Sequence, residues 1–141
     1  LHIKNQLIYF MGMKLKVALF LLFFMSYLYP GQSETLFDSI SSYLKRYRQY
    51  IEEKDVTVKN GVIYLELDGR RTNLNSLLLL GFHSVGRQLQ RSGSSFREVQ
   101  IIINYEMKNT QQMVATAKME SVMALSQGRI NPEQFFNEVR Y

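Results

Sequence analysis

Apolar side chains recur at steps of three and four residues between residues 35 and 53. This spacing places them on one side of an α-helix and is typical of a helix that packs against a core. Lys45, Arg46 and Arg48 fall largely off that side. We therefore predict a first helix over residues 35–53, with an apolar side made of Leu36, Ile40, Tyr43, Leu44, Tyr47 and Ile51.

An alternation of apolar and polar residues follows over residues 55–67, around the pair Asn60-Gly61, with Val62 and Tyr64 as apolar residues at polar positions. Both residues tolerate positive φ, so the pair is a strong signal for a two-residue hairpin turn. The turn and the alternation agree on one register, which places on one face Val56, Val58, Ile63, Leu65 and Leu67. The other face then carries Thr57, Lys59, Val62, Tyr64 and Glu66.

A second helical pattern spans residues 73–91, with Asn73 or Asn75 able to cap its start. Its apolar positions in register are Leu74, Leu78, Phe82, Val85 and Leu89. Gly81 and Gly86 lie inside this helix, where glycine costs up to about 1 kcal/mol relative to alanine. They indicate either close approach to the sheet or local looseness.

Alternation returns over residues 96–107, which we predict to be a third strand, with Ile102 on its polar face. A fourth strand follows over residues 112–119, and a short helix from near Met119 to Gly128. The alternative is a helix that already begins at Gln112. We favour the strand because it gives the third strand a local partner.

The C-terminal end carries a helix-start signal in which Asn131 is the cap and Pro132 the first helical residue. Gln134 completes a capping box. We predict a last helix from Pro132 to Arg140 that buries Phe135 or Phe136 together with Val139.

The resulting order of elements is α-ββ-α-ββ-α. It predicts an α+β fold with a four-stranded, mostly antiparallel sheet and helices packed on one face. The outward face of the sheet keeps Val62, Tyr64 and Ile102, and we expect the first helix or another chain to cover part of it. The order resembles that of several small α+β binding modules, including secretion-chaperone-like folds, but topology alone does not define a function.

Residues 13–34 contain the parts of a secretory signal: basic residues, an uncharged stretch from Val17 to Tyr29, and small residues before a cleavage point after Ser33. The uncharged stretch is shorter than the about 20 apolar residues that a membrane-spanning helix needs. We therefore expect a signal peptide over residues 1–33, cleaved to leave residues 34–141 as a single small α+β domain, periplasmic or secreted.

The alternative is an uncleaved anchor in the inner membrane, because residues 1–10 add apolar length upstream. Only in that case do we expect contact with a membrane. Met11 and Met13 are both candidates for the true start, in which case the residues before them come from an over-extended reading frame.

Removal of the leader changes the charge of the chain. The full chain has 17 basic and 12 acidic residues, but Lys4, Lys14 and Lys16 precede the cleavage point, which leaves 14 basic and 12 acidic residues. This small excess argues against a nucleic-acid partner, for which a basic stripe is expected.

The chain has no cysteine, so thiol chemistry, disulfides and cysteine metal sites are excluded. It also has no Asn-x-Ser/Thr sequon, which favours a bacterial exported protein.

Residues with catalytic chemistry are few and isolated. His83 is the only histidine after the leader, and no Gly-x-Ser-x-Gly motif accompanies the serines. Glu66 and Asp68 share one strand face, but the neighbouring arginines oppose the raised pKa that a general acid needs. We therefore predict no catalytic residue, no metal site, no cofactor and no enzymatic activity.

The stretch Arg70, Arg71, Thr72, Asn73 is the most site-like one. It places two guanidinium groups beside a helix N-terminus, whose free N–H groups favour an anion or a partner carboxylate. The competing interpretation is a solvated turn whose arginines pair with Glu66 and Asp68.

Tyr43, Tyr47 and Tyr50 fall along one side of the predicted first helix, interleaved with basic residues. This arrangement suits an anionic membrane surface or nucleic-acid stacking, but it is more typical of a packing face. We interpret these tyrosines as a candidate face for a protein partner.

These observations predict an exported, non-enzymatic binding or assembly protein of the bacterial periplasm or envelope, which contacts another protein or itself. The alternative function is a binder of small anions or anionic lipid heads through Arg70 and Arg71. A hydrolase that uses Glu66, Asp68 or His83 is the third hypothesis.

Overall fold

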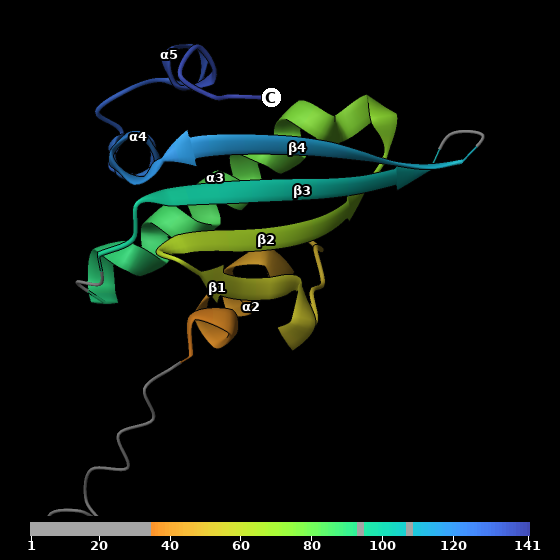
Figure 1. Ribbon diagram of the computed structural model, residues 1–141, viewed down its shortest axis with the longest axis horizontal. Coiled ribbons are helices and arrows are strands. Elements are labelled where there is room, and N and C mark those ends of the chain that lie inside the picture. Colours follow the sequence, from red (N-terminus) through yellow and green to blue (C-terminus); the bar gives the residue numbers. More distant parts are fainter. Residues whose placement is uncertain (1–34, 93–94, 107–108) are drawn as a thin grey trace, which may run out of the picture. The chain divides into compact units, whose positions relative to one another are not determined.

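Four strands form one mixed sheet in the order β1-β2-β3-β4 in the computed structural model, which describes residues 35–92, 95–106 and 109–141 (Figure 1). The outer pairs β1–β2 and β3–β4 are antiparallel, and the central pair β2–β3 is parallel. The α+β class and the mostly antiparallel four-stranded sheet are therefore confirmed. The predicted leader, residues 1–33, lies outside the described residues. The strands are β1 (Val56–Lys59), β2 (Val62–Gly69), β3 (Glu98–Glu106) and β4 (Thr110–Lys118).

The predicted hairpin forms with the predicted register. Val58 lies opposite Ile63, and Val56 lies opposite Leu65. Asn60 has φ 53° and Gly61 has φ 74°, the two successive positive values that a type I′ turn requires. Local turn chemistry and strand alternation therefore determine this part of the fold together.

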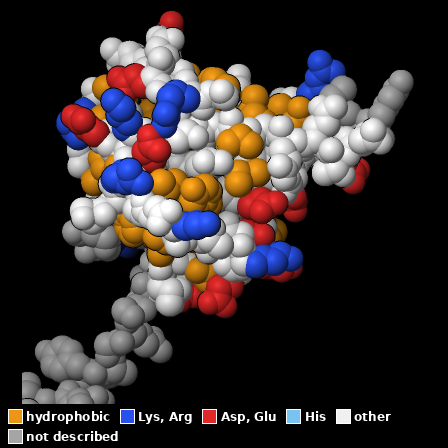
Figure 2. Space-filling model, viewed as in Figure 1, with side chains coloured by type: hydrophobic (Ala, Val, Ile, Leu, Met, Phe, Trp, Pro, Cys, Tyr) orange, Lys and Arg blue, Asp and Glu red, His pale blue; other side chains and the backbone are white. Residues whose placement is uncertain are grey.

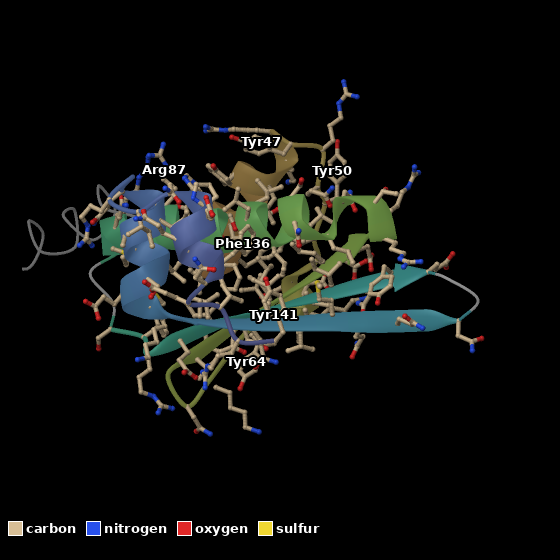
Figure 3. All side chains as sticks on the ribbon, turned by 90° about the horizontal axis from the view of Figure 1, so that it is seen from above. Tyr47, Tyr50, Tyr64, Arg87, Phe136 and Tyr141 are labelled. Atoms are coloured by element: carbon tan, nitrogen blue, oxygen red, sulfur yellow. The ribbon has the colours of Figure 1, made fainter. Side chains whose placement is uncertain are left out.

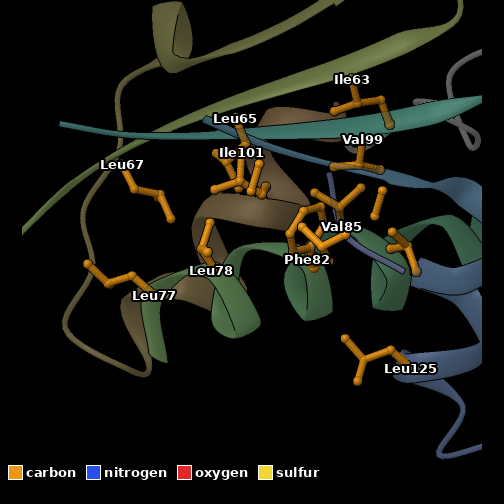
Figure 4. Packing of buried hydrophobic residues seen from close by; sticks show 14 of the residues in the cluster. Ile63, Leu65, Leu67, Leu77, Leu78, Phe82, Val85, Val99, Ile101 and Leu125 are labelled. Carbon is orange, nitrogen blue, oxygen red and sulfur yellow. The ribbon is translucent and has the colours of Figure 1, made fainter. Parts of the chain in front are cut away.

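The helix α3 (Leu74–Ser92) connects β2 to the parallel strand β3, after a short 3₁₀ turn, η2 (Arg71–Asn73). It lies across the sheet, and its apolar side contacts the inward side chains of β2 and β3 (Figure 4). The buried residues of this contact include Ile63, Leu65, Leu67, Leu77, Leu78, Phe82, Val85, Val99 and Ile101. They form the centre of the hydrophobic core.

The helix α2 (Leu36–Lys45) is shorter than the helix that the sequence predicts, and the prediction is wrong beyond residue 45. Thr35 caps its start. At its end the N–H of Gln49 donates to the carbonyl of Leu44, and the N–H of Arg48 donates to that of Lys45. These are the bonds of a Schellman motif, and Arg48 takes the left-handed position with φ 59°. The chain therefore turns away, and residues 49–52 connect to η1 (Glu53–Asp55) without forming a helix or strand.

The fourth strand and the two short helices after it agree with the sequence pattern. β4 ends at Lys118 and α4 (Met119–Ser126) begins directly, so the alternative helix from Gln112 is wrong. The helix α5 (Pro132–Phe136) has the predicted capping box of Asn131 and Gln134. It ends before the predicted Arg140, because Arg140 instead exchanges two backbone hydrogen bonds with Thr116 of β4.

The two glycines of α3 mark close contacts with different neighbours. A Cβ on Gly81 would lie 3.1 Å from Ile101 Cδ1, so α3 approaches the sheet there as predicted. A Cβ on Gly86 would lie 2.7 Å from Ser126 Oγ and 2.9 Å from the carbonyl oxygen of Val122. Gly86 therefore lets α4, rather than the sheet, approach α3.

All helices of the described chain lie on one side of the sheet (Figures 1 and 3). Ile40 and Leu44 of α2 are buried in the same core as α3, so the first helix does not cover the outward face. That part of the sequence expectation is wrong. No helix in the described ranges is long and apolar enough to span a membrane.

Candidate functional site

The uncovered face of the sheet has an apolar centre. Val62 and Tyr64 of β2, Ile102 of β3 and Val114 of β4 all point to this face, and Ile102 lies directly opposite Val114. Figure 3 shows Tyr64 on the side of the sheet that faces away from the helices. Val62 is buried by its neighbours, whereas Tyr64 and Ile102 are partly exposed and Val114 is 39% exposed. We call these four residues the apolar centre.

A row of polar side chains crosses the sheet next to this centre. The Asn104 amide nitrogen donates to Glu66 Oε1, and Asn104 Oδ1 accepts a hydrogen bond from Gln112 Nε2 at 2.9 Å. The three side chains come from β2, β3 and β4. Because each holds the next in place, this part of the face is ordered before any ligand binds.

Charge is divided between the two ends of the uncovered face. Lys59 and Lys118 lie at the end where β2 and β3 begin, where Arg140 neutralises Glu98 by an ion pair. Asp68 and Glu106 lie with Glu66 toward the end where β2 and β3 finish. Figure 2 looks onto this face and shows Lys and Arg intermixed with some Asp and Glu to the left of the hydrophobic centre, and mostly Asp and Glu along its lower right. The outward strand positions therefore carry a net positive charge at one end of the face and a net negative charge at the other.

The acidic end contains a cavity of about 290 Å³. Four carboxylate residues line it together with Tyr50, Lys54, Leu67 and Asn104; they are Glu52, Asp55, Glu66 and Asp68. The cavity lies where β1 pairs only with residues 62–65 of β2, so the rest of that strand edge has no strand partner and faces η1. The sequence did not predict this cavity, because Glu52 lies inside the helix predicted to reach residue 53 and Asp55 begins the predicted hairpin segment.

The predicted anion site lies at the start of α3, around a shallow cavity of about 190 Å³. Arg71, Thr72 and Asn73 line it with the first turn of α3 and with Met113 of β4. Asn73 Oδ1 accepts a hydrogen bond from the backbone N–H of Arg70 at 2.8 Å. The arginines do not pair with Glu66 or Asp68: in the described part of the chain the ion pairs are Lys54–Glu52 and Arg140–Glu98.

The structure separates the three tyrosines of the predicted partner face. Tyr43 and Tyr47 stay together, with ring centroids 5.4 Å apart, and Tyr47 is 54% exposed. Tyr50 is 75% exposed and lines the acidic cavity instead, because the chain turns at Arg48. The single helical face that the sequence predicts is therefore wrong for Tyr50.

His83 of α3 completes the cluster with Tyr43, whose hydroxyl lies 3.1 Å from His83 Nδ1. Burial raises the pKa of Tyr43 to about 12, and the hydrogen bond to Tyr47 adds to this effect. Burial, helped by the positive charge of Arg87, lowers the pKa of His83 below its usual value. Both groups are therefore neutral near pH 7, and their contact packs α2 against α3.

The residues that could support catalysis remain apart from one another. His83 lies in the helical layer, whereas Glu66 and Asp68 lie on or beside the uncovered face. In the described ranges no three His, Cys, Asp or Glu side chains lie close enough to hold a metal ion.

Comparison with known proteins finds no matching family model, no similar curated protein and no similar solved structure.

Proposed function

We propose that the chain is a non-enzymatic binding or assembly protein, exported to the bacterial periplasm or envelope, and that it contacts another protein chain through the uncovered face of its sheet. The supporting observation is that the helices cover one face only, while the other carries an apolar centre of Val62, Tyr64, Ile102 and Val114. Export rests on the signal-like pattern of residues 13–34.

The composition of this face favours a contact surface over a solvated one. A sheet face that stays in water carries polar residues at alternate positions. Here Tyr64, Ile102 and Val114 bring apolar side chains from three strands to one region. Apolar groups that are gathered in this way and surrounded by charged and polar residues are typical of protein interaction sites.

Photo-crosslinking in native cells tests this proposal. A benzoylphenylalanine at position 64 or 114 should form an adduct with a protein chain, because both positions lie in the proposed contact. The matched control is position 91, where exposed Arg91 lies on α3 in the helical layer. Equal adducts at all three positions, or none at 64 and 114, would contradict the proposal.

A second candidate function is the binding of small anions or anionic lipid heads at the start of α3. It is favoured by the cavity that Arg71, Thr72 and Asn73 line, and by the finding that Arg70 and Arg71 do not pair with the nearby carboxylates. Phosphate or sulfate should then raise the melting temperature of the wild type, and an Arg70→Ala/Arg71→Ala variant should lose this increase. An equal increase in both proteins would exclude the site.

A further inference from the structure

We propose that the occupant of the uncovered face is a second copy of this chain, stacked face to face about a twofold axis. This inference rests on the proposed function and names its partner. The charge pattern of the face supports it: Lys59 and Lys118 lie at one end, and Asp68 and Glu106 lie at the other.

Only one kind of twofold stacking makes these ends complementary. If the axis runs parallel to the strands, each end faces the same end of the other copy, and like charges meet. If the axis lies in the interface and runs across the strands, the strand direction reverses and the basic end of each copy faces the acidic end of the other. The second arrangement brings opposite charges together at both ends of the interface, because a twofold interface uses the same patch on both copies.

In the same arrangement, the apolar centre of one copy packs against the apolar centre of the other. Tyr64, Ile102 and Val114 lie between the two charged ends along the strands, so they stay near the axis in both copies. Packed sheets meet about 10 Å apart with interdigitated side chains. The dimer thus has an apolar middle and a charged rim, which is the usual anatomy of a specific interface.

The acidic cavity provides a place for a basic side chain of the second copy. Lys59 projects from the edge strand β1, and the cavity lies on the same edge of the sheet, beyond the other end of that strand. Reversal of the strand direction brings Lys59 of one copy toward this cavity in the other. Glu52 already pairs with Lys54, and Glu66 accepts a hydrogen bond from Asn104, so Asp68 is the cavity carboxylate that we expect to accept this lysine.

The size of the face predicts a weak dimer. β3 and β4 have nine residues each, so the face measures roughly 30 Å by 19 Å at the usual strand dimensions. This footprint is below the about 800 Å² per partner of a standard interface, so we expect a weak, transient dimer.

Charge-reversed variants test the arrangement by analytical ultracentrifugation of residues 34–141, which form a compact unit with a core of their own. One variant, Lys59→Glu/Lys118→Glu, makes both ends acidic; the other, Asp68→Lys/Glu106→Lys, makes both ends basic. All four positions are exposed, so the fold should be unaffected. We expect each variant alone to dimerise at least about tenfold more weakly than the wild type. An equimolar mixture of the two should recover the wild-type affinity to within about threefold, because both ends are then complementary.

The matched control is Lys45→Glu/Arg91→Glu, which changes the net charge as much as the first variant but on the helical layer. Its dimerisation should equal that of the wild type. A wild type that stays monomeric up to about 1 mM would overturn the inference, as would a mixture that associates no better than its components.

The outcomes for the two proposals are distinguishable. If the wild type is monomeric while position 64 crosslinks to a different protein in cells, the uncovered face remains the contact surface and only the second copy is wrong. If position 64 gives no adduct and the wild type is monomeric, both proposals fail. If the wild type dimerises but the reversed variants associate equally well, the contact lies elsewhere and the inference is overturned.

Discussion

The two faces of the sheet are built from the same strands but differ in what covers them. Ile101 and Ile102 are neighbours in β3; Ile101 is fully buried beneath α3, whereas Ile102 is partly exposed on the other side. Since side chains alternate along a strand, one segment supplies both surfaces. The covered face stabilises the fold, and the uncovered face is free to bind. Stability and binding should therefore respond to different substitutions.

The contribution of the covered face to stability depends on close packing. Association through the uncovered face depends on exposed groups. α3 approaches the sheet at Gly81 and approaches α4 at Gly86. On the uncovered face, Val114 is 39% exposed and charged residues surround the centre. A substitution that changes the volume under α3 therefore acts on folding, and one that changes charge on the uncovered face acts on association.

Truncation of the two neighbouring isoleucines gives the largest contrast. Ile101→Ala should lower the free energy of unfolding by about 3 kcal/mol, because it leaves a cavity in the core. Ile102→Ala should cost about 1 kcal/mol, since its side chain is only partly buried and solvent can fill the space. Urea denaturation measures both values. Equal losses would contradict the division between the faces.

The glycines of α3 test the packing of the covering layer. Gly86→Ala should destabilise by about 2 kcal/mol, because its Cβ would meet the backbone oxygen of Val122, which cannot move without shifting α4. Gly81→Ala meets side-chain methyl groups of Ile101 and Leu67, which can shift, and it gains about 1 kcal/mol of helix propensity. It should be nearly neutral. A greater loss at Gly81 would show that the contact with the sheet is the tighter one.

The end of α2 offers a gain in stability. Arg48 has φ 59°, a conformation that costs a non-glycine residue roughly 1 kcal/mol. Arg48→Gly should therefore raise the free energy of unfolding by up to about 1 kcal/mol. Asn60→Gly is the control, because asparagine tolerates its φ of 53° and the gain there should be smaller. Destabilisation by Arg48→Gly would mean that the arginine side chain contributes more than the backbone conformation costs.

Acid should weaken the covering layer through His83. Its pKa is lowered in the folded state, so the unfolded chain binds a proton at higher pH than the folded chain does. The contribution of neutral His83 to the free energy of unfolding is therefore fully present above the ordinary histidine pKa of about 6.5. It is lost as the pH falls through the pKa of His83 in the folded chain. His83→Gln should reduce this loss between about pH 7 and pH 5, in a series of urea denaturations. If His83→Gln loses as much free energy of unfolding as the wild type over this pH range, groups other than His83 cause the acid sensitivity.

Much of the fold could be predicted from the sequence because its signals are local. Asn60-Gly61 determines a turn, and the alternation around it determines the register; Asn131, Pro132 and Gln134 likewise determine a helix start. The end of α2 could not be predicted, because Arg48 adopts a conformation that sequence rules assign to glycine. The predicted helix therefore continued too far, and Tyr50 was placed on the wrong surface.

The candidate site was predicted only in part, because some of it depends on tertiary structure that local sequence patterns do not determine. The outward direction of Val62, Tyr64 and Ile102 follows from alternation and is confirmed. The outward direction of Val114 likewise follows from the predicted fourth strand, although no face was assigned to Val114. The cavity lined by Glu52 and Asp55 depends instead on a tertiary fact, a β1 that is shorter than β2. No local pattern reports the relative lengths of paired strands.

Methyl NMR spectra recorded at increasing protein concentration test the central claim most directly, because they observe both faces in one experiment. As the concentration rises from about 10 µM to about 1 mM, the methyl resonances of Ile102 and Val114 should shift together with one dissociation constant. Those of Ile101 and Ala115, which are buried on the covered face of the same strands, should not move. Shifts confined to methyl groups of the helical layer, or no shift at Ile102 and Val114, would contradict the assignment of the uncovered face as the contact surface between two copies.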